Sequence, residues 1–154
     1  MTFTLHGICP LLHVFDMTAS LRFYRDVLGF AVIDQAGPAN DIGWVLLSLR
    51  GAELMLNTAY EMDARPPAPA PARQAAHDDT ALFFGCEDLD ALHAHLVAHG
   101  VEARPPERTG YGFRAVSVHD PDGYALCFHW PVTQQGYDRW VERYGLPPKS
   151  IPAD

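Results

Sequence analysis

Cysteine and positive charge are both scarce in this chain. The three cysteines are Cys9, Cys86 and Cys127. An odd number at wide spacing does not suggest a disulfide framework, so we expect free thiols in a reducing cytoplasm. Lysine and arginine number 11 against 19 aspartates and glutamates, which gives a net charge of −8. Nucleic acids and anionic membrane surfaces attract basic surfaces, so this balance argues against both as partners.

The chain also lacks a long apolar run. No stretch is long and apolar enough to span a bilayer, and the first ten residues, MTFTLHGICP, do not place a basic region before an apolar block. We therefore expect neither a membrane span nor a signal peptide. Apolar residues nevertheless make up 48% of the 154 positions. That is enough to form one compact domain or two small modules that share a core.

Residues 8–30 predict a strand followed by an amphipathic helix. The first part, residues 8–15, is short, apolar and free of glycine, which favours a strand. Asp16 begins the helix, because its carboxylate can accept hydrogen bonds from the unpaired N–H groups there. Apolar residues then recur at helical spacing. Gly29 ends the helix, since glycine readily adopts the left-handed conformation required at that position.

A similar pattern returns in the second half of the chain. Asp88 begins a predicted helix that ends at Gly100, and Asp16 and Asp88 lie 72 positions apart, while Gly29 and Gly100 lie 71 apart. This spacing indicates an internal repeat of one βαβββ unit. The other predicted strands are residues 30–34, 43–49 and 52–57 in the first module, and 80–86, 101–103, 113–119 and 124–130 in the second.

The predicted fold class is α+β, with two βαβββ modules. We expect the first module at residues 8–60, a linker at 61–79, the second module at 80–131, and a C-terminal helix and tail at 132–154. The Pro- and Ala-rich part of the linker, residues 64–76, predicts no regular helix or sheet. In the tail, the predicted helix covers residues 137–144.

Ordered short motifs recur in both halves. They are Asp16, Ser20-Leu21, Phe23-Tyr24 and Leu28-Gly29-Phe30 in the first, and Asp88-Leu89-Asp90, Gly100-Val101, Tyr111-Gly112 and Asp120-Pro121-Asp122-Gly123-Tyr124 in the second. With these motifs, residues 8–131 resemble the vicinal oxygen chelate superfamily, which includes glyoxalase I, bleomycin-resistance proteins and extradiol dioxygenases. The resemblance implies curved sheets around a central cavity that binds a small molecule, and a homodimer. The modules then pair either within one chain or by exchange between two.

Enzymes of this superfamily hold a divalent metal with His or Glu at four places. Aligned on the motifs, these places carry Cys9, Met55, Ala81 and Cys127 in this chain. Alanine has no donor atom and methionine is a poor ligand for Mg, Mn, Fe or Ni. The resemblance therefore favours the bleomycin-resistance-like branch, whose members sequester a ligand without a metal. We expect a cytoplasmic protein that binds a small, partly aromatic molecule with no cofactor.

An alternative is a metal-dependent lyase or dioxygenase with an altered ligand set. His13, Glu53, Cys127 and His129 would then hold a divalent metal such as Fe, Mn, Ni or Zn. Two further readings stay open. Cys127 and His129 share a strand face and have the residue types of a nucleophile and its base. The same two residues with Cys9 have the donor types of a zinc site.

Aromatic side chains are the main candidates for the walls of a cavity, because flat rings bind flat ligands well. Glycines flank Trp44 and Tyr111, which indicates close approach or mobile loops there. Arg114 either pairs an anionic group of the ligand or lies on an exposed strand face. The candidate walls are Trp44, Tyr60, Tyr111, Phe113, Phe128 and Trp130. The candidate ligand-binding residues are His13, Trp44, Tyr60, Tyr111, Phe113, Arg114, Cys127 and His129.

Overall fold

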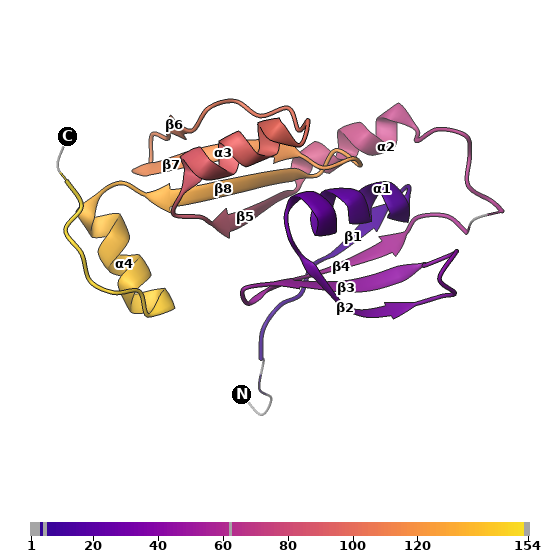
Figure 1. Ribbon diagram of the computed structural model, residues 1–154, viewed down its shortest axis with the longest axis horizontal. Helices are drawn as coiled ribbons and strands as arrows, with labels where there is room; N and C mark the ends of the chain where they lie inside the picture. The colour runs from indigo at the N-terminus through magenta and orange to yellow at the C-terminus, as the bar shows by residue number, and fades with distance from the viewer. Residues whose placement is uncertain (1–3, 5, 62, 153–154) are drawn as a thin grey trace. The chain divides into compact units, whose positions relative to one another are not determined.

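The structure is a computed structural model that describes residues 4, 6–61 and 63–152. The chain divides into two compact units. The first contains Met1–His77 together with Asp120–Gly123, and the second contains Asp78–His119 and Tyr124–Asp154. Each unit carries a four-stranded sheet with a helix on one of its faces (Figure 1). The predicted α+β class with two βαβββ modules is confirmed.

The first unit contains the sheet β1-β4-β3-β2. Strand β1 runs parallel to β4, and the other pairs are antiparallel. Strands β3 and β4 alternate buried residues with partly exposed ones, as expected for a sheet with one covered face. The strands are β1 (Leu11–Val14), β2 (Ala31–Ala36), β3 (Trp44–Leu49) and β4 (Ala52–Thr58).

The helix of the first unit begins where the sequence predicts. The Asp16 carboxylate accepts hydrogen bonds from the backbone N–H groups of the first turn. Helix α1 (Met17–Leu21) continues as the π-helix η1 (Arg22–Val27). Gly29 follows with a φ of +84°, a left-handed conformation that glycine adopts without strain. The buried residues of this segment include Leu21, Phe23 and Tyr24, and α1 packs against β4 of the first sheet.

The second unit repeats this design with the sheet β5-β8-β7-β6. Helix α3 (Leu89–Ala98), capped by the Asp88 carboxylate, covers one face (Figure 1). Beyond β8, helix α4 (Gln134–Tyr144) ends at Gly145. The strands are β5 (Ala81–Gly85), β6 (Glu107–Arg108), β7 (Phe113–His119) and β8 (Ala125–Pro131).

Two predictions about secondary structure are wrong. Residues 101–103 do not form a strand, because the N–H of Val101 still bonds to the carbonyl of Leu96 at the end of α3. The short strand comes later, at Glu107–Arg108. The Pro-rich segment is not free of regular structure, since it contains α2 (Pro71–Ala76) and a 3-10 turn, η2 (His77–Asp79). Proline occupies the first helical turn of α2, where its missing N–H costs nothing.

The turn between β7 and β8 is held inside the first unit by two buried carboxylates. Asp120 accepts a hydrogen bond from the Tyr24 hydroxyl at 2.9 Å. Asp122 accepts from the backbone N–H of Phe15 at 2.8 Å and from Arg73 Nη1 at 2.7 Å. Arg73 belongs to α2, which explains why this helix forms next to the turn. Asp120 and Asp122 therefore hold this turn in place through hydrogen bonds within the first unit.

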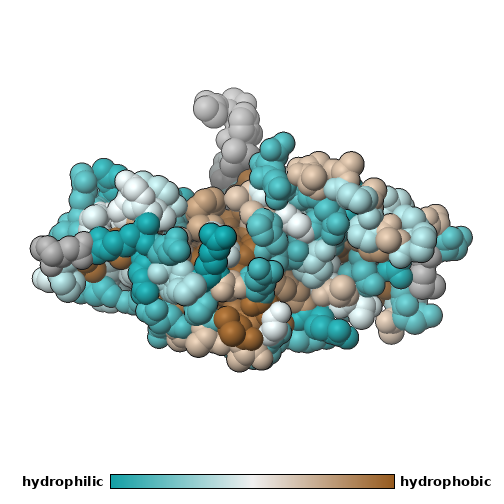
Figure 2. Space-filling view, turned by 90° about the horizontal axis from the view of Figure 1, so that it is seen from above, coloured by the Kyte–Doolittle hydropathy of each residue, from teal (hydrophilic) through white to brown (hydrophobic). Residues whose placement is uncertain are grey.

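Hydrophilic side chains cover much of the face shown in Figure 2, with apolar patches between them. Across the described parts of the chain, no helix is both long enough and apolar enough to cross a membrane.

Candidate functional site

The two sheets repeat one register, which defines equivalent positions in the two units. In the first sheet Leu11 pairs with Met55, and in the second Phe83 pairs with Cys127, 72 residues further along in each case. The residue two positions beyond Met55 is Asn57, and its equivalent in the second unit is His129. Both lie on the sheet face opposite the helix, because side chains two apart in a strand point the same way.

The four places implied for a metal do not fit one. Met55 and Ala81 offer a thioether and a methyl group. The two cysteines would have to bind as thiolates. Burial raises the pKa of Cys9, with a smaller contribution from the nearby Glu53 carboxylate, and burial also raises the pKa of Cys127. No group of three or more His, Cys, Asp or Glu that could hold a metal occurs in the described part of the chain.

The alternative ligand set is not gathered around one point within either unit. His13 pairs in register with Asn57, four residues beyond Glu53 on β4. At about 3.3 Å per residue, His13 and Glu53 are separated by about 13 Å, too far to share an ion. Cys127 and His129 share a face, but no hydrogen bond joins their side chains among the described residues. Ser117 interacts with the Cys127 thiol instead.

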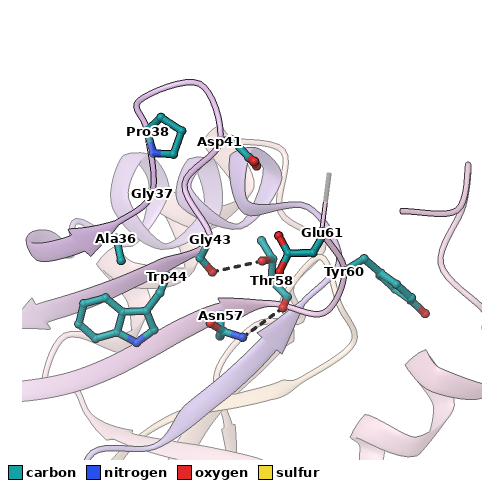
Figure 3. Close-up of a pocket in the computed structure, with 10 residues that line it drawn as sticks. All are labelled: Ala36, Gly37, Pro38, Asp41, Gly43, Trp44, Asn57, Thr58, Tyr60 and Glu61. Carbon is teal, nitrogen blue, oxygen red and sulfur yellow. Dashed lines mark hydrogen bonds between the residues drawn. The ribbon is translucent and has the colours of Figure 1, made fainter. Parts of the chain in front are cut away.

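A pocket of about 370 Å³ lies in the first unit, at the end of strands β3 and β4 (Figure 3). Its wall combines one indole ring with amide, hydroxyl and carboxylate groups. Trp44, Asn57 and Thr58 are each partly buried, and Glu61 is exposed. The lining residues are Ala36, Gly37, Pro38, Asp41, Gly43, Trp44, Asn57, Thr58, Tyr60 and Glu61.

Backbone geometry shapes the loop that closes one side of this pocket. Gly37 has a φ of +105°, and a Cβ atom there would lie 2.4 Å from the carbonyl oxygen of Asp41. Only glycine therefore fits at this point of the loop. On the strand side, Thr58 donates from its hydroxyl to the carbonyl of Gly43 at 3.3 Å, and Asn57 donates from Nδ2 to the carbonyl of Thr58 at 3.1 Å.

Two of the predicted site residues, Trp44 and Tyr60, line the pocket. They do so differently, because the Trp44 ring lies along the strand side while the Tyr60 ring points away from the other lining residues (Figure 3). The Tyr60 ring packs edge-on against Phe15, with ring centroids 6.0 Å apart. His13 is exposed on β1, and its carbonyl accepts a hydrogen bond from Arg73.

Three other predicted residues meet in the second unit. The rings of Phe113 and His129 stack with centroids 4.8 Å apart, and Tyr111 lies 5.7 Å from Phe113. Trp140, from α4, contacts both Phe113 and His129. Cys127 is buried on the same sheet face. We call Phe83, Phe113, His129 and Trp140 the aromatic box.

The predicted residues Arg114 and Phe128 lie on the other face of the second sheet. Arg114 forms a bidentate ion pair with Asp90 of α3, with distances of 2.6 and 2.8 Å. Phe128 is buried and stacks on Phe84. Arg114 is thus already paired with a carboxylate of its own chain, and Phe128 belongs to the core.

Sequence reasoning missed several of the lining residues and the part played by α4. Asp41 and Glu61 lie in loops, where no periodic pattern marks them as site residues. Asn57 could have been found, since it shares a strand face with Met55. Trp140 lies in a helix of which only the later part, residues 137–144, was predicted. Nothing in the local pattern shows which surface this helix covers.

The comparisons with known proteins agree with this architecture. A model of the Glyoxalase/Bleomycin resistance protein/Dioxygenase superfamily matches residues 8–128. The uncharacterized protein YaeR of Escherichia coli (strain K12) is 30% identical over 115 residues, which cover 72% of this chain and 84% of YaeR.

Two solved structures share the fold at low sequence identity. A bleomycin-binding protein in complex with bleomycin is 18% identical with a TM-score of 0.60, over 81% of this chain and 98% of the other. TnmS3, an antibiotic-binding protein from Streptomyces sp. CB03234, is 22% identical with a TM-score of 0.60, over 84% of this chain and 98% of TnmS3. At these identities the likeness concerns the fold alone.

Proposed function

The chain belongs to the Glyoxalase/Bleomycin resistance protein/Dioxygenase superfamily, and on that premise we propose that it sequesters a small, partly aromatic cation in the pocket of its first unit. Binding would need no metal cofactor and would leave the ligand chemically unchanged. One observation carries the proposal. The pocket combines an indole ring with two carboxylates, and none of its ten described lining residues is basic.

The chemistry of the wall favours a positive charge attached to a flat ring. Trp44 offers a large aromatic face, and a cation near such a face is attracted by about 0.5–2 kcal/mol. Asp41 and Glu61 add two negative charges at the rim. Asn57 and Thr58 supply polar groups that can orient a ligand. With a net charge of −8, the whole chain also attracts cations more readily than anions.

Two further observations support binding over catalysis. Met55 and Ala81 stand where enzymes of the superfamily place metal ligands, so the donor set for a Lewis acid is incomplete. Two proteins with the same fold are named for what they bind, bleomycin for the bleomycin-binding protein and an antibiotic for TnmS3. We propose the same kind of task here, a reversible capture of a small molecule.

We also propose a homodimer in the cytoplasm. The superfamily commonly completes its ligand cavity with a second copy. Cys9, Cys86 and Cys127 are all free thiols in the structure, which suits a reducing compartment. Size-exclusion chromatography with light scattering would give the mass of the particle directly.

The test is calorimetric titration of metal-stripped protein with 2-naphthylmethylammonium, a fused aromatic ring that carries an ammonium group. We expect saturable binding that Trp44→Ala weakens about tenfold, because the stacking face is lost. The double variant Asp41→Asn/Glu61→Gln should weaken binding and reduce its dependence on salt.

Matched controls separate the pocket from general effects of charge and aromatic surface. Tyr144→Ala removes an exposed aromatic ring in the second unit, and Asp79→Asn/Glu102→Gln removes the same number of charges from exposed positions there. Both should bind like the wild type. Binding that appears only after a divalent metal is added would overturn the proposal.

A further inference from the structure

We propose that the aromatic box of the second unit is a separate binding site for a planar aromatic anion, which stacks on the box and accepts a hydrogen bond from Nε2 of His129. This site goes beyond the proposed function. It lies in the other unit, uses other residues, and takes a ligand of the opposite charge.

The box brings together rings from four elements. Phe83 of β5 lies 5.3 Å from His129 of β8, and Trp140 of α4 lies 5.2 Å from the same ring, both at steep angles. The ring of Phe113 of β7 stacks on the ring of His129. Phe83 is nevertheless 57% exposed. A large aromatic ring left exposed beside other rings offers a stacking surface for a flat ligand.

His129 is the polar group of the box. Its Nδ1 atom is buried and has no hydrogen-bond partner among the described residues. Nε2 is not buried in the same way, and no side chain of the described structure bonds to it. A ring nitrogen that is buried without a partner lowers the stability of the folded state. Such a cost is expected where a residue is retained for binding rather than for stability.

The surroundings decide which nitrogen carries the proton. A neutral imidazole has a single N–H group, on Nδ1 or on Nε2. A buried N–H without an acceptor is rarer in proteins than a buried acceptor without a donor. The proton therefore belongs on Nε2, where it can reach solvent or a ligand. From there it would donate to a carboxylate or a similar acceptor at the edge of the ligand.

The position in the fold supports this assignment. His129 is equivalent to Asn57, which lines the pocket of the first unit. The repeat thus places a polar group at the same point of each sheet. The charges around the two differ, because the other members of the box, Phe83, Phe113 and Trp140, are uncharged. At the margin, Arg143 lies over the ring of Tyr144, which in turn contacts Trp140.

The experiment compares two probes that share a ring system. We expect 2-naphthoate to bind metal-free protein, and His129→Phe to weaken this binding about tenfold, since the flat ring is kept and one hydrogen bond to a charged group is lost. Phe83→Ala should also weaken it. His99 is exposed directly after the last residue of α3. The matched control His99→Phe should therefore bind like the wild type.

Nuclear magnetic resonance keeps the proposal testable if a variant fails to fold. In the wild type, nitrogen-15 spectra of the imidazole should show the proton of His129 on Nε2, and naphthoate should shift the His129 and Trp140 signals. A proton on Nδ1, or naphthoate binding that is unchanged in His129→Phe, would overturn the proposal. The two sites fail separately, because Trp44→Ala should affect only the ammonium probe and His129→Phe only the naphthoate.

Discussion

His129 should make the free energy of unfolding depend on pH. Burial lowers its pKa below the value of about 6.5 that it has in the unfolded chain. Between these two values the unfolded chain binds more protons than the folded one, so the free energy of unfolding falls as the pH falls. The stability associated with a neutral His129 is fully present above about pH 6.5 and is lost on acidification.

This gives a prediction for His129→Phe. The phenylalanine cannot be protonated, so the variant lacks this part of the pH dependence. We expect the difference in unfolding free energy, wild type minus variant, to decrease between pH 8 and pH 5.5 in urea titrations. Parallel curves for the two proteins would show that His129 does not resist protonation in the folded state.

Asp122 carries a second prediction at the level of one side chain. Only 2% of it is exposed, and it accepts hydrogen bonds from the N–H of Phe15 and from Arg73. Asp122→Ala leaves both donors without this acceptor, so we expect the free energy of unfolding to drop by about 3 kcal/mol. Denaturant unfolding measures this directly. Asp79→Asn, at an exposed position, should change stability by less than about 0.5 kcal/mol.

At the scale of elements, helix α4 depends on a glycine in β5. A Cβ atom on Gly85 would lie 2.8 Å from Cζ3 of Trp140, closer than side chains pack. Gly85→Ala should therefore push α4 away from the sheet and cost about 1–3 kcal/mol of stability. The effect should shrink in a Trp140→Leu background, which removes the clashing ring.

Gly110→Ala is the matched control for this cycle. Within the described structure nothing lies within 4 Å of a Cβ built at Gly110, so the added methyl group should be tolerated. If Gly85→Ala costs the same with and without the indole ring, α4 does not pack on β5 as described. Tryptophan fluorescence would report the displacement of Trp140 in the single variant.

Most elements could be predicted because each has a local cause. Asp16 and Asp88 cap helices with their own carboxylates, and Gly29 and Gly100 end them in the left-handed conformation. The alternation in residues 113–119 reproduces β7 with its exact bounds. The elements that were predicted wrongly depend on residues far away in the sequence. Helix α2 is anchored by a turn some fifty residues away, and such a partner leaves no mark on the local pattern.

The candidate site was harder to predict than the fold for the same reason. Trp44 stood out because a glycine precedes it, and it lines the pocket. Asp41 and Glu61 lie in loops, and they line the same pocket as Trp44 because the pairing of β3 and β4 brings these segments together. Arg114 was a reasonable candidate for binding an anionic group. It instead forms an ion pair with Asp90, which comes from a separate helix.

At the scale of the whole molecule, we expect stability and ligand binding to be independent of divalent metal ions. Met55 and Ala81 cannot complete a divalent site, so treatment with a chelator should leave the melting temperature and the affinity for 2-naphthylmethylammonium unchanged. Elemental analysis of the purified protein should find no stoichiometric Fe, Mn, Ni or Zn. A metal that copurifies and is lost in His129→Ala would instead favour a lyase or dioxygenase.

The most direct measurement is a crystal structure of metal-stripped protein grown with 2-naphthylmethylammonium. The account predicts electron density for the naphthyl ring against Trp44, with the ammonium group within reach of Asp41 and Glu61. Density for the probe elsewhere with this pocket left empty, or a cation bound at Cys9 and Met55, would contradict it.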